Sequence, residues 1–423
     1  MALALSPRLE SITRTVTGRD ASLFGDDWQR LAGELRERIA GRRVLVVGGA
    51  GTIGAATAVE LASLGPATLL VMDPSENNSV ELLRTLRSMT PAYEGEIAVA
   101  PLDYGSPLAR RWLERQPPID LVLSFAALKH VRSERDAFSL LRMLDVNVVA
   151  ADRFLAACRR CGHGRHGVFF VSTDKAANPV SMMGASKRAM EMLLWAHGDA
   201  GTPASLLDGG AASPIDRVCS ARFANVAFSD GSLPWGYLQR IEKRQPLALP
   251  GDVRRYFISP REAGQLCLLA AFVCPDRHFL IPRLDPERDL VTFEAVAAAT
   301  LRAYGLEPAR YEDPAEARRA VAFEIERGRY PVVVTSSDTS GEKEVEVFTA
   351  ADEVPVDVGL NGALAVRGIG GGAGPLADLL RRVDGACRGA GPLPSKAELV
   401  RLLGRVVPEL CHRETGRVLD ARM

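Results

Sequence analysis

Several features that would mark a specialised environment are absent from this sequence of 423 residues. Lysine plus arginine number 52 and aspartate plus glutamate also number 52, so no overall basic field attracts a nucleic-acid backbone. Aromatic residues are scarce at 6%, yet 47% of the residues are hydrophobic and 25% are charged. This balance excludes a disordered or collagen-like chain and predicts a globular protein with no nucleic-acid partner.

Long apolar runs and a disulfide framework are also missing. No segment reaches the roughly 18 uninterrupted apolar residues of a membrane span, and the start MALALSPRLESITR does not resemble a signal peptide. The 7 cysteines are scattered without disulfide spacing, which favours a reducing compartment. The string CRRCGHGRH at 158–166 is too compressed for a usual zinc finger, so we expect no metal site. Together these features predict a soluble, cytoplasmic protein with no membrane partner.

Strands and helices alternate through the first half of the chain. An apolar strand, a glycine turn and an alanine-rich helix make up RRVLVVGGAGTIGAATAVELASLG, and further apolar strands follow at ATLLVMD, GEIAVAPLD, IDLVLSFAA, HGVFFVST and RVCSARFAN. This alternation predicts an α/β fold, a modified Rossmann doubly wound parallel sheet. Beyond residue 230 the alternation weakens. We expect a helical lead-in over 1–40, a Rossmann NAD(P)-binding domain over 41–230, and a smaller C-terminal substrate-binding lobe with C-terminal helices over 231–423.

A glycine-rich turn follows the first of these strands. Gly48, Gly51 and Gly54 form a G-x-x-G-x-x-G pattern that opens a helix. The first glycine allows a tight turn, the second lets a pyrophosphate approach the backbone, and the third allows close helix packing. The pattern predicts a dinucleotide site that includes Thr52 and Ile53 at the helix start. An ordinary glycine turn is the alternative.

Residues after the next strands extend this predicted cofactor site. Asp73 ends the second strand, where an acid takes a ribose hydroxyl and repels the extra phosphate of NADP. Ser75 nearby keeps an NADP site open. Asp103 lies either beside the adenine or as a cap of the following turn. Ala126 and Ala127 form a small-residue turn that lets nicotinamide approach the backbone, so the predicted cofactor is NAD or NADP.

Three longer strings carry more specific information. They are SFAALKHVRSERD after the fourth strand, VSTDKAANPVSMMGASK after the fifth, and RFANVAFSDGS with RRYFIS further on. Together they resemble the extended short-chain dehydrogenase/reductase family, specifically its nucleotide-sugar 4,6-dehydratases of the polysaccharide-biosynthesis branch. Within that branch, GRDASLF, SENNSVEL and HRETGRVLD are most similar to enzymes of legionaminic-acid-type pathways that act on GDP-N-acetylglucosamine. Close relatives use UDP-N-acetylglucosamine.

The resemblance implies a concealed redox cycle. Hydride leaves carbon 4 of the sugar, water is lost from carbons 5 and 6, and hydride returns at carbon 6, so a tightly bound cofactor is regenerated in each turnover. Asp174 matches the acid for the hydroxyl at carbon 6, Lys175 the base at carbon 5, and Thr173 the hydroxyl that contacts the oxygen at carbon 4. From the residues alone, Asp174 and Lys175 follow a parallel strand, at the edge where ligands bind. A surface salt pair is the alternative.

One position departs from the wider family. Met183 stands four residues before Lys187, where most short-chain dehydrogenases carry a tyrosine, and a thioether transfers no proton. Some members of the dehydratase branch have methionine there, so the resemblance still implies activity. The group that deprotonates the carbon-4 hydroxyl stays open between Thr173, a water, and Lys187 acting through either. Lys187 also matches the lysine that holds the nicotinamide ribose.

Basic and polar residues are candidates for binding the nucleotide sugar. Arginine offers a charge-assisted fork to phosphate, and the family strings supply further polar positions. The predicted substrate-binding residues are Lys129, His130, Asn225, Ser229, Arg240 and Arg255, with Arg254 as the solvated neighbour of Arg255. The polar string SSDTSGEKE at 336–344 is a dimer or substrate-lobe loop to which we assign no chemistry.

The sequence therefore predicts an NDP-N-acetylglucosamine 4,6-dehydratase, GDP- or UDP-linked, in bacterial glycan or nonulosonic-acid biosynthesis. The resemblance implies a homodimer or higher homo-oligomer. A nucleotide-sugar epimerase or 4-dehydrogenase shares the first hydride step but needs no eliminating pair such as Asp174 and Lys175. A catalytically silent nucleotide-sugar binding protein is favoured only by Met183.

Overall fold

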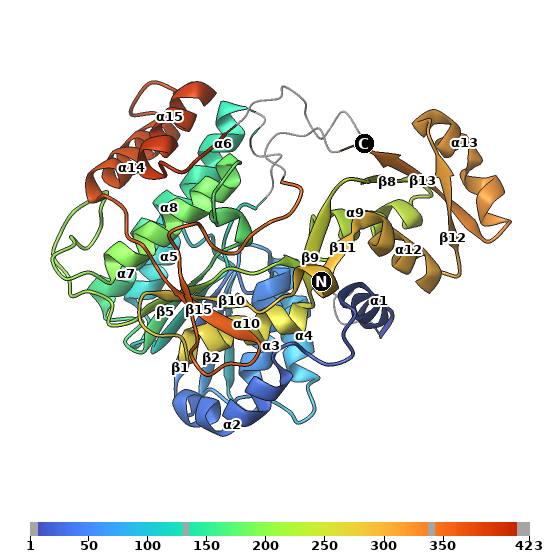
Figure 1. Ribbon diagram of the computed structural model, residues 1–423. Helices are drawn as coiled ribbons and strands as arrows, with labels where there is room; N and C mark the ends of the chain where they lie inside the picture. The colour runs from blue at the N-terminus through green and yellow to red at the C-terminus, as the bar shows by residue number, and fades with distance from the viewer. Residues whose placement is uncertain (1–6, 130–133, 135, 337–342, 413–423) are drawn as a thin grey trace.

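A mainly parallel β-sheet forms the centre of the larger of two lobes (Figure 1). The computed structural model describes residues 7–129, 134, 136–336 and 343–412. Within these residues the sheet has nine strands in the order β14-β15-β10-β6-β5-β4-β1-β2-β3. Strands β10 to β3 in this order are parallel, whereas β15 and β14 are antiparallel at one edge. The bounds are β1 (Arg43–Val47), β2 (Thr68–Met72), β3 (Glu96–Ala100), β4 (Leu121–Ser124), β5 (Gly167–Val171), β6 (Val218–Ala221), β10 (His278–Pro282), β14 (Pro355–Val356) and β15 (Ala363–Arg367).

The sequence of strands β3-β2-β1-β4-β5-β6 confirms the predicted doubly wound α/β fold. Strands such as β2 and β5 are buried along their whole length because their apolar residues are covered on both faces. The strand order reverses between β1 and β4, which opens a crevice at the carboxyl ends of the strands. Ligands of such sheets bind in that crevice.

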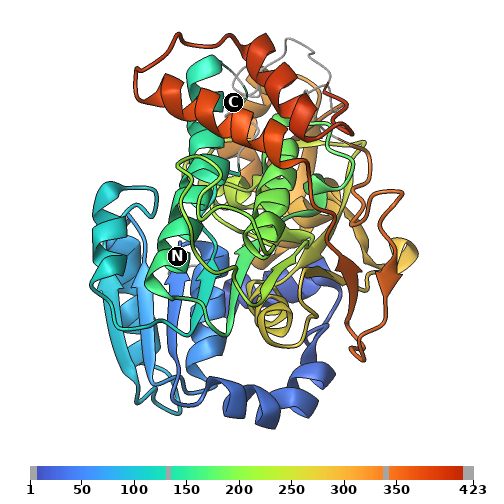
Figure 2. The same ribbon diagram turned by 90° about the vertical axis from the view of Figure 1, so that its left-hand side faces the viewer.

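Two groups of helices cover the two faces of this sheet. Their buried apolar side chains form separate hydrophobic cores, one on each face. Figure 2 shows the last two helices, in red, stacked outside the green helices. One face holds α2 (Gly25–Ile39), α3 (Thr52–Ala62), α4 (Glu76–Arg87) and α10 (Pro260–Phe272). The other holds α5 (Pro107–Glu114), α6 (Ala137–Leu144), α7 (Ala150–Cys161), α8 (Met182–His197), α14 (Ala373–Cys387) and α15 (Lys396–Val406).

A π-helical turn, Asp145–Val149, joins α6 to α7. Such turns widen a helix locally and often occur near functional sites. Here the turn carries Asn147, which exchanges two hydrogen bonds with the backbone of Leu128 at 2.8 and 2.9 Å and donates to Ser186 of α8 at 2.9 Å. The loop after β4 is thereby tied to α8.

The smaller lobe is built around a three-stranded parallel sheet in the order β12-β13-β8. A second short sheet, β11-β9-β7, lies between it and the larger lobe. The helices of this lobe and its connections are α1 (Pro7–Thr17), α9 (Leu233–Glu242), α11 (Pro286–Asp289), α12 (Phe293–Ala303) and α13 (Pro314–Ile325). The strands are β7 (Asn225–Val226), β8 (Leu247–Pro250), β9 (Arg254–Ile258), β11 (Leu290–Thr292), β12 (Glu307–Tyr311) and β13 (Arg329–Thr335).

The chain passes between the two lobes more than once. The lobes therefore do not correspond to two consecutive segments, 41–230 and 231–423. Helix α10 packs on α3, and β10 joins the sheet beside β6, although both follow residue 230. The short apolar strands β10 and β15 complete the sheet, and the chain reaches them only after it has entered the smaller lobe. The lead-in also serves both lobes, because α1 packs on α12 whereas α2 packs on α10.

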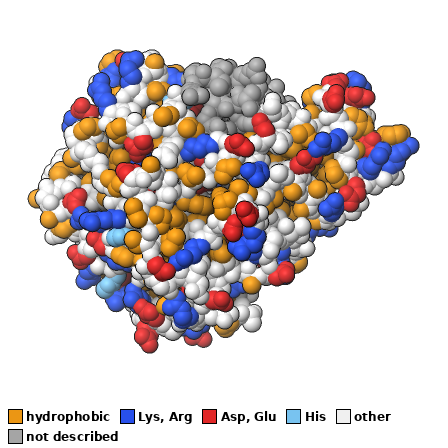
Figure 3. Space-filling model, viewed as in Figure 1, with side chains coloured by type: hydrophobic (Ala, Val, Ile, Leu, Met, Phe, Trp, Pro, Cys, Tyr) orange, Lys and Arg blue, Asp and Glu red, His pale blue; other side chains and the backbone are white. Residues whose placement is uncertain are grey.

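The surface where the two lobes meet is rich in apolar side chains. Figure 3 shows them gathered along the middle of this face, with charged side chains spread around its edges. In the part of the chain that the structure describes, none of the helices has the length and apolar character needed to cross a bilayer.

Candidate active site

The turn after β1 has the geometry of a pyrophosphate cradle. Gly48 has a φ of +68°, and a Cβ there would lie 2.7 Å from the backbone nitrogen of Ala126. A Cβ on Gly54 would collide with the Gly48 carbonyl oxygen. At Gly51, by contrast, a Cβ would meet no atom nearer than 3.5 Å. Packing explains the glycines at 48 and 54, whereas Gly51 leaves an open approach to the N-terminus of α3.

Asp73 lies beside this turn at the carboxyl end of β2. Its Oδ2 accepts a hydrogen bond from the Ala50 N–H at 3.1 Å, and its Oδ1 accepts one from the Ser75 N–H at 2.9 Å. Burial raises the pKa of Asp73, and the two hydrogen bonds oppose that shift. The Ser75 hydroxyl caps α4, and Ile53 packs against the neighbouring core. The structure thus brings Asp73 and Ser75 together at the predicted turn.

Two further predicted cofactor residues have contacts within the protein. Thr52 Oγ1 accepts a hydrogen bond from the Asp230 N–H at 3.0 Å, which joins the glycine turn to the loop after β7. Asp103 accepts one from the Gly105 N–H at 2.9 Å and pairs with Arg142 at 3.0 Å. Asp103 therefore makes the turn-capping contact that was the alternative to a place beside the adenine.

The loop after β5 brings the predicted proton-transfer groups together. A single 3₁₀ turn, Asp174–Ala176, follows the strand, and the Thr173 hydroxyl caps it. Thr173 Oγ1 donates to Asp174 Oδ1 at 2.7 Å, and Lys175 Nζ lies 3.1 Å from the same oxygen. The side chain of Asp174 is only 3% exposed and that of Lys175 is 25% exposed. A carboxylate buried to this degree is not part of a surface salt pair.

Two residues that sequence reasoning did not assign complete this cluster. Glu346 Oε1 lies 3.9 Å from Lys175 Nζ, and Glu346 Oε2 lies 3.4 Å from Lys343 Nζ. Lys343 also donates to the Ala177 carbonyl at 2.9 Å. Both residues lie at or just beyond the end of the polar string at 336–344, whose positions 337–342 lie outside the described residues. That string was the available signal, but its polarity alone did not indicate which side chains it would meet.

Helix α8 begins beside this cluster and carries Met183 and Lys187 one turn apart. Met183 is buried, and its backbone N–H donates to Glu134 Oε1 at 3.0 Å. Burial raises the pKa of Glu134. Burial also lowers the pKa of Lys187 to about 8, against the opposing charge of Glu191. A substantial fraction of Lys187 is therefore a free amine at mildly basic pH.

The predicted substrate side lies between the loops after β4 and β7. Ala126 and Ala127 are half-buried, and Lys129 Nζ donates to Ser229 Oγ at 3.4 Å. Among the described residues, the buried amide nitrogen of Asn225 has no hydrogen-bond partner, so it is available to a ligand. The predicted residue His130 lies outside the described residues.

The two predicted phosphate-binding arginines have different surroundings. Arg255 is buried on β9, whereas its neighbour Arg254 is exposed. Arg255 Nη1 donates to the Glu344 carbonyl at 3.0 Å, so it contacts the segment that carries Glu346. Arg240 Nη1 instead donates to the Pro246 carbonyl at 2.8 Å and fastens the turn after α9.

A buried ionic network supports the cluster from within the larger lobe. Arg222, just after β6, pairs with Glu191 of α8 at 2.7 Å and with Glu353 at 2.5 Å, and all three side chains are 0% exposed. Arg188 lies 3.1 Å from both carboxylates. Burial alone would raise the pKa of Glu191, but the charge and hydrogen bonds of Arg222, with help from Arg188, lower it to about 2. Ser172, at the end of β5, donates to Glu191 at 2.5 Å.

The string at 158–166 is only partly buried, with Cys158 and His163 inside the larger lobe and Arg165 and His166 exposed. The His163 Nδ1 accepts a hydrogen bond from the Ile119 N–H at 3.2 Å, and its Nε2 lies 3.0 Å from the Leu113 carbonyl. Cys158 is fully buried, and burial raises the pKa of its thiol. Hydrogen bonds with the backbone account for the buried His163, and burial in the core accounts for Cys158.

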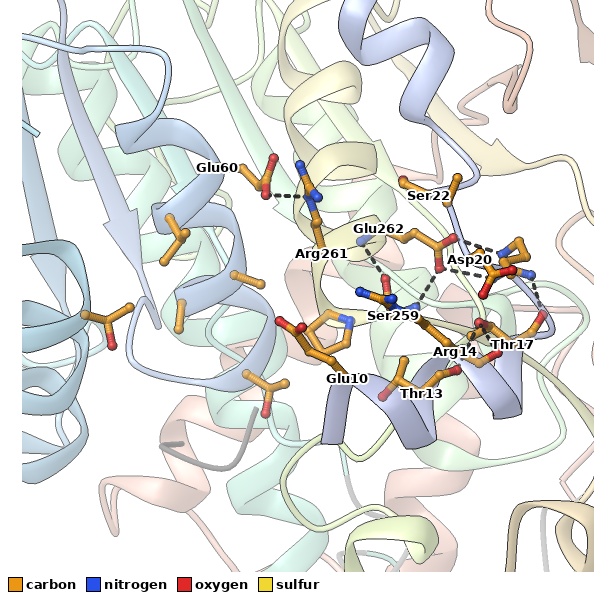
Figure 4. A pocket seen from close by; sticks show the side chains of 18 of the residues that line it. Glu10, Thr13, Arg14, Thr17, Asp20, Ser22, Glu60, Ser259, Arg261 and Glu262 are labelled. Atoms are coloured by element: carbon orange, nitrogen blue, oxygen red, sulfur yellow. Dashed lines mark hydrogen bonds and ion pairs between the residues drawn. The ribbon is translucent and has the colours of Figure 1, made fainter. Parts of the chain in front are cut away.

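A cavity of about 530 Å³ lies between α1, α3, α4 and α10 and reaches Thr52 at the start of α3 (Figure 4). Two arginines of its lining pair with carboxylates of the lining, Arg261 with Glu60 at 3.1 Å and Arg19 with Glu262 at 2.9 Å. Glu262 and Ser259 also form the capping box of α10. The cavity therefore marks where the lead-in is fastened to the larger lobe.

Comparison with known sequences places this chain among proteins of glycan synthesis. Its residues 44–318 match the family model described as polysaccharide biosynthesis protein. The chain is 28% identical over 270 residues to an uncharacterized membrane protein of Methanocaldococcus jannaschii, covering 63% of this chain and 74% of that protein. It is 26% identical over 254 residues to the probable polysaccharide biosynthesis protein EpsC of Bacillus subtilis, covering 59% of this chain and 39% of that protein. It is 25% identical over 201 residues to the UDP-N-acetylglucosamine 4,6-dehydratase (inverting) of Campylobacter jejuni, covering 46% of this chain and 52% of that enzyme.

Solved structures share the fold at low sequence identity. Pen from Bacillus thuringiensis superposes with a TM-score of 0.59 at 19% identity, covering 78% of this chain and 90% of that one. A UDP-glucuronic acid 4-epimerase from Bacillus cereus, solved with NAD, gives a TM-score of 0.52 at 13% identity, covering 75% and 90%. These likenesses show the Rossmann-type fold.

The family match covers more than half of the chain and includes the glycine turn, the loop after β5, the start of α8 and strand β9. Glu346 lies beyond it. Because the match extends across residues 44–318, the chain belongs to the polysaccharide biosynthesis protein family.

Proposed function

We propose that this protein is a 4,6-dehydratase of a nucleotide-linked N-acetylglucosamine, with GDP or UDP as the nucleotide, in bacterial glycan or nonulosonic-acid biosynthesis. The observation that carries the proposal is the cluster after β5, where Thr173 and Lys175 both contact Asp174 Oδ1 within 3.1 Å. Elimination of water needs an acid and a base on neighbouring atoms of the substrate, and this pair supplies both. Similarity to the Campylobacter jejuni UDP-N-acetylglucosamine 4,6-dehydratase supports the reaction class.

The glycine turn fits a nicotinamide dinucleotide, and we propose NAD. The open approach at Gly51 and the N-terminus of α3 suit a pyrophosphate, and the fixed carboxylate of Asp73 suits a ribose hydroxyl. Asp73 disfavours NADP because a carboxylate repels a phosphate on that ribose. When bound, NAD would accept a hydride from carbon 4 and return it at carbon 6. Lys187 would hold the nicotinamide ribose. The NAD in the Bacillus cereus epimerase structure agrees with this assignment.

Different residues of the chain carry out the separate proton transfers of this reaction. Lys175, as a free amine, takes the proton from carbon 5. Asp174, as a neutral carboxyl, gives its proton to the hydroxyl that leaves carbon 6 as water. After these two transfers Lys175 is an ammonium and Asp174 a carboxylate, which matches the pair at 3.1 Å. Lys175 then returns its proton to carbon 5.

The carbon-4 hydroxyl needs a route for its proton that avoids Met183. A thioether neither donates nor usefully accepts a proton. Lys187 lies one turn further along α8, and its pKa of about 8 leaves free amine available for this step. We therefore assign the proton to Lys187, acting through Thr173 or a water. This proton finally restores the acid form of Asp174.

The remaining substrate contacts come from both lobes. We assign Lys129, Ser229, Asn225 and Arg255 to the sugar and its diphosphate, because they lie on the loops after β4 and β7 and on β9. Arg240 remains a further candidate for the diphosphate, and its Nη1 also donates to the Pro246 carbonyl. We further propose that the enzyme works in the cytoplasm as a homodimer or higher homo-oligomer.

The test is incubation of the purified protein with GDP- and UDP-N-acetylglucosamine, without added reductant, followed by mass spectrometry. We expect a product lighter by one water and no accumulation of reduced cofactor, and the preferred nucleotide identifies the substrate. A product of unchanged mass would favour the epimerase alternative, and reduced cofactor would favour a 4-dehydrogenase. Binding with neither change would favour a silent binding protein and would attribute the loss of activity to Met183.

A further inference from the structure

A segment from the C-terminal part of the chain crosses the catalytic cluster. Residues 343–353, termed here the crossing segment, lie between β13 of the smaller lobe and β14 at the edge of the large sheet. Near its start, the Glu344 carbonyl accepts a hydrogen bond from Arg255 at 3.0 Å. At its end, the Glu353 carboxylate pairs with the buried Arg222 at 2.5 Å. Both ends of the crossing segment are therefore bonded to residues outside it, Arg255 of β9 and Arg222 after β6.

The crossing segment places Glu346 between two lysines. The Glu346 side chain is 3% exposed, and its two oxygens lie 3.9 Å from Lys175 Nζ and 3.4 Å from Lys343 Nζ. The Ala177 carbonyl holds Lys343 on the other side, at 2.9 Å. Lys175 in turn lies between Glu346 and Asp174, the latter at 3.1 Å. The amine of the proposed base thus has a carboxylate on each side.

We propose that Glu346 is a positioning residue that stabilises and orients the ammonium form of Lys175, an inference that rests on the proposed dehydration. In that step the C–H bond at carbon 5 breaks and an N–H bond forms on Lys175. The O–H bond of Asp174 breaks as the hydroxyl leaves carbon 6 with its proton as water. Asp174 is neutral until then, so it cannot serve as a full counter-ion while Lys175 takes up its proton.

Lys343 explains how a second carboxylate is tolerated at this position. Burying an unpaired charge is costly, and two carboxylates that flank one amine would repel each other. The Lys343 ammonium, 3.4 Å from Glu346 Oε2, compensates the negative charge of Glu346. Asp174 then remains the carboxyl that gives up a proton.

The test compares Glu346→Gln with Glu344→Gln, which makes the same change at an exposed side chain of the same segment. For Glu346→Gln we expect kcat to fall by roughly 10- to 100-fold with little change in KM, as for partial loss of general-base function. The rise of kcat with pH should move to lower pH, because an amide no longer favours the ammonium form of Lys175. Glu346→Asp, which keeps the charge, should restore the pH profile in part. Glu344→Gln should match the wild type.

Equal kcat and equal pH profiles for the two glutamine variants would overturn the inference. Labelling of Lys175 by reductive methylation, read by peptide mass spectrometry without substrate, provides a measurement that needs no turnover. We expect faster labelling in Glu346→Gln than in Glu344→Gln, because more of the amine is free. If the wild type dehydrates neither nucleotide sugar, the proposed function fails. The labelling then tests only the ion pair between Glu346 and Lys175. Faster labelling of Lys175 in Glu346→Gln than in Glu344→Gln supports the pair, and equal labelling overturns it. If Glu346→Gln does not fold, Glu346→Asp carries the same comparison.

Discussion

At the scale of single residues, the glycine turn separates the needs of folding from those of ligand binding. A side chain at Gly54 would collide with the Gly48 carbonyl oxygen, whereas one at Gly51 would meet no atom nearer than 3.5 Å. The spacing of the glycines predicts the site. Only the structure distinguishes which glycine the fold itself requires.

Gly51→Ala should therefore fold like the wild type but bind the cofactor poorly. The added methyl fits the protein and blocks the approach of a pyrophosphate to the N-terminus of α3. We expect an unchanged Tm and at least a roughly 10-fold loss of NAD affinity, measured by calorimetry, a loss of about 1.4 kcal/mol. Gly54→Ala, the matched control, should lower Tm. Normal NAD binding by a folded Gly51→Ala variant would exclude this turn as the pyrophosphate site.

Lys175→Ala tests the proposed base directly. Loss of a general base lowers turnover by on the order of 10² to 10⁴-fold, and cofactor binding should be spared because Lys175 follows β5 rather than the glycine turn. The measurements are kcat for loss of water and the NAD affinity of the same preparation. Unchanged turnover in the variant would remove Lys175 from this role.

The residues that carry the proposed chemistry differ in how readily the sequence predicts them. Asp174 and Lys175 are adjacent, follow an apolar strand and belong to a specific string, so their proximity is predictable. Glu346 meets Lys175 only because the crossing segment returns from the smaller lobe. No local pattern encodes that contact. Asp103 shows the opposite case, since its local turn-capping hydrogen bond was one of two predicted alternatives.

At the scale of elements, the buried network of Arg222, Glu191 and Glu353 joins β6, α8 and the crossing segment. Arg222→Met leaves two fully buried carboxylates with less compensation. Removing one partner of a buried pair costs about 3 to 5 kcal/mol, and we expect the lower value because Arg188 still contacts both carboxylates. Urea unfolding measures this loss. Arg84→Met, whose exposed side chain pairs with Glu81 on α4, should change stability by less than about 1 kcal/mol. Similar losses in both variants would contradict a stabilising role for the network.

The same network predicts a pH dependence of stability. Arg222 helps to hold the pKa of Glu191 at about 2, below the ordinary glutamate value of 4.5. A lowered pKa in the folded state gives stability that is present above the unfolded pKa and is lost as the pH falls towards the folded one. The deficit of Arg222→Met relative to the wild type should therefore shrink between pH 7 and pH 3. Urea midpoints at both pH values measure it, and a deficit independent of pH would show that the charge of Glu191 is not involved.

At the scale of the whole molecule, periodicity in the sequence predicts the doubly wound sheet but not the path of the chain between the lobes. The order β3-β2-β1-β4-β5-β6 follows from strands and helices that alternate locally. The later strands β10 and β15 are short apolar runs that pair with distant partners, so a boundary at residue 230 assigns them to the wrong side. This return of the chain to the larger sheet is what carries the crossing segment over the proposed active site.

The central claim is an internal hydride transfer coupled to loss of water. The most direct measurement uses GDP- and UDP-N-acetylglucosamine deuterated at carbon 4, with the product analysed by mass spectrometry and NMR. We predict a product that has lost one water and carries the deuterium at carbon 6, with no net reduction of NAD. Deuterium that appears in released NADH, or that stays at carbon 4 of a product of unchanged mass, would contradict the account.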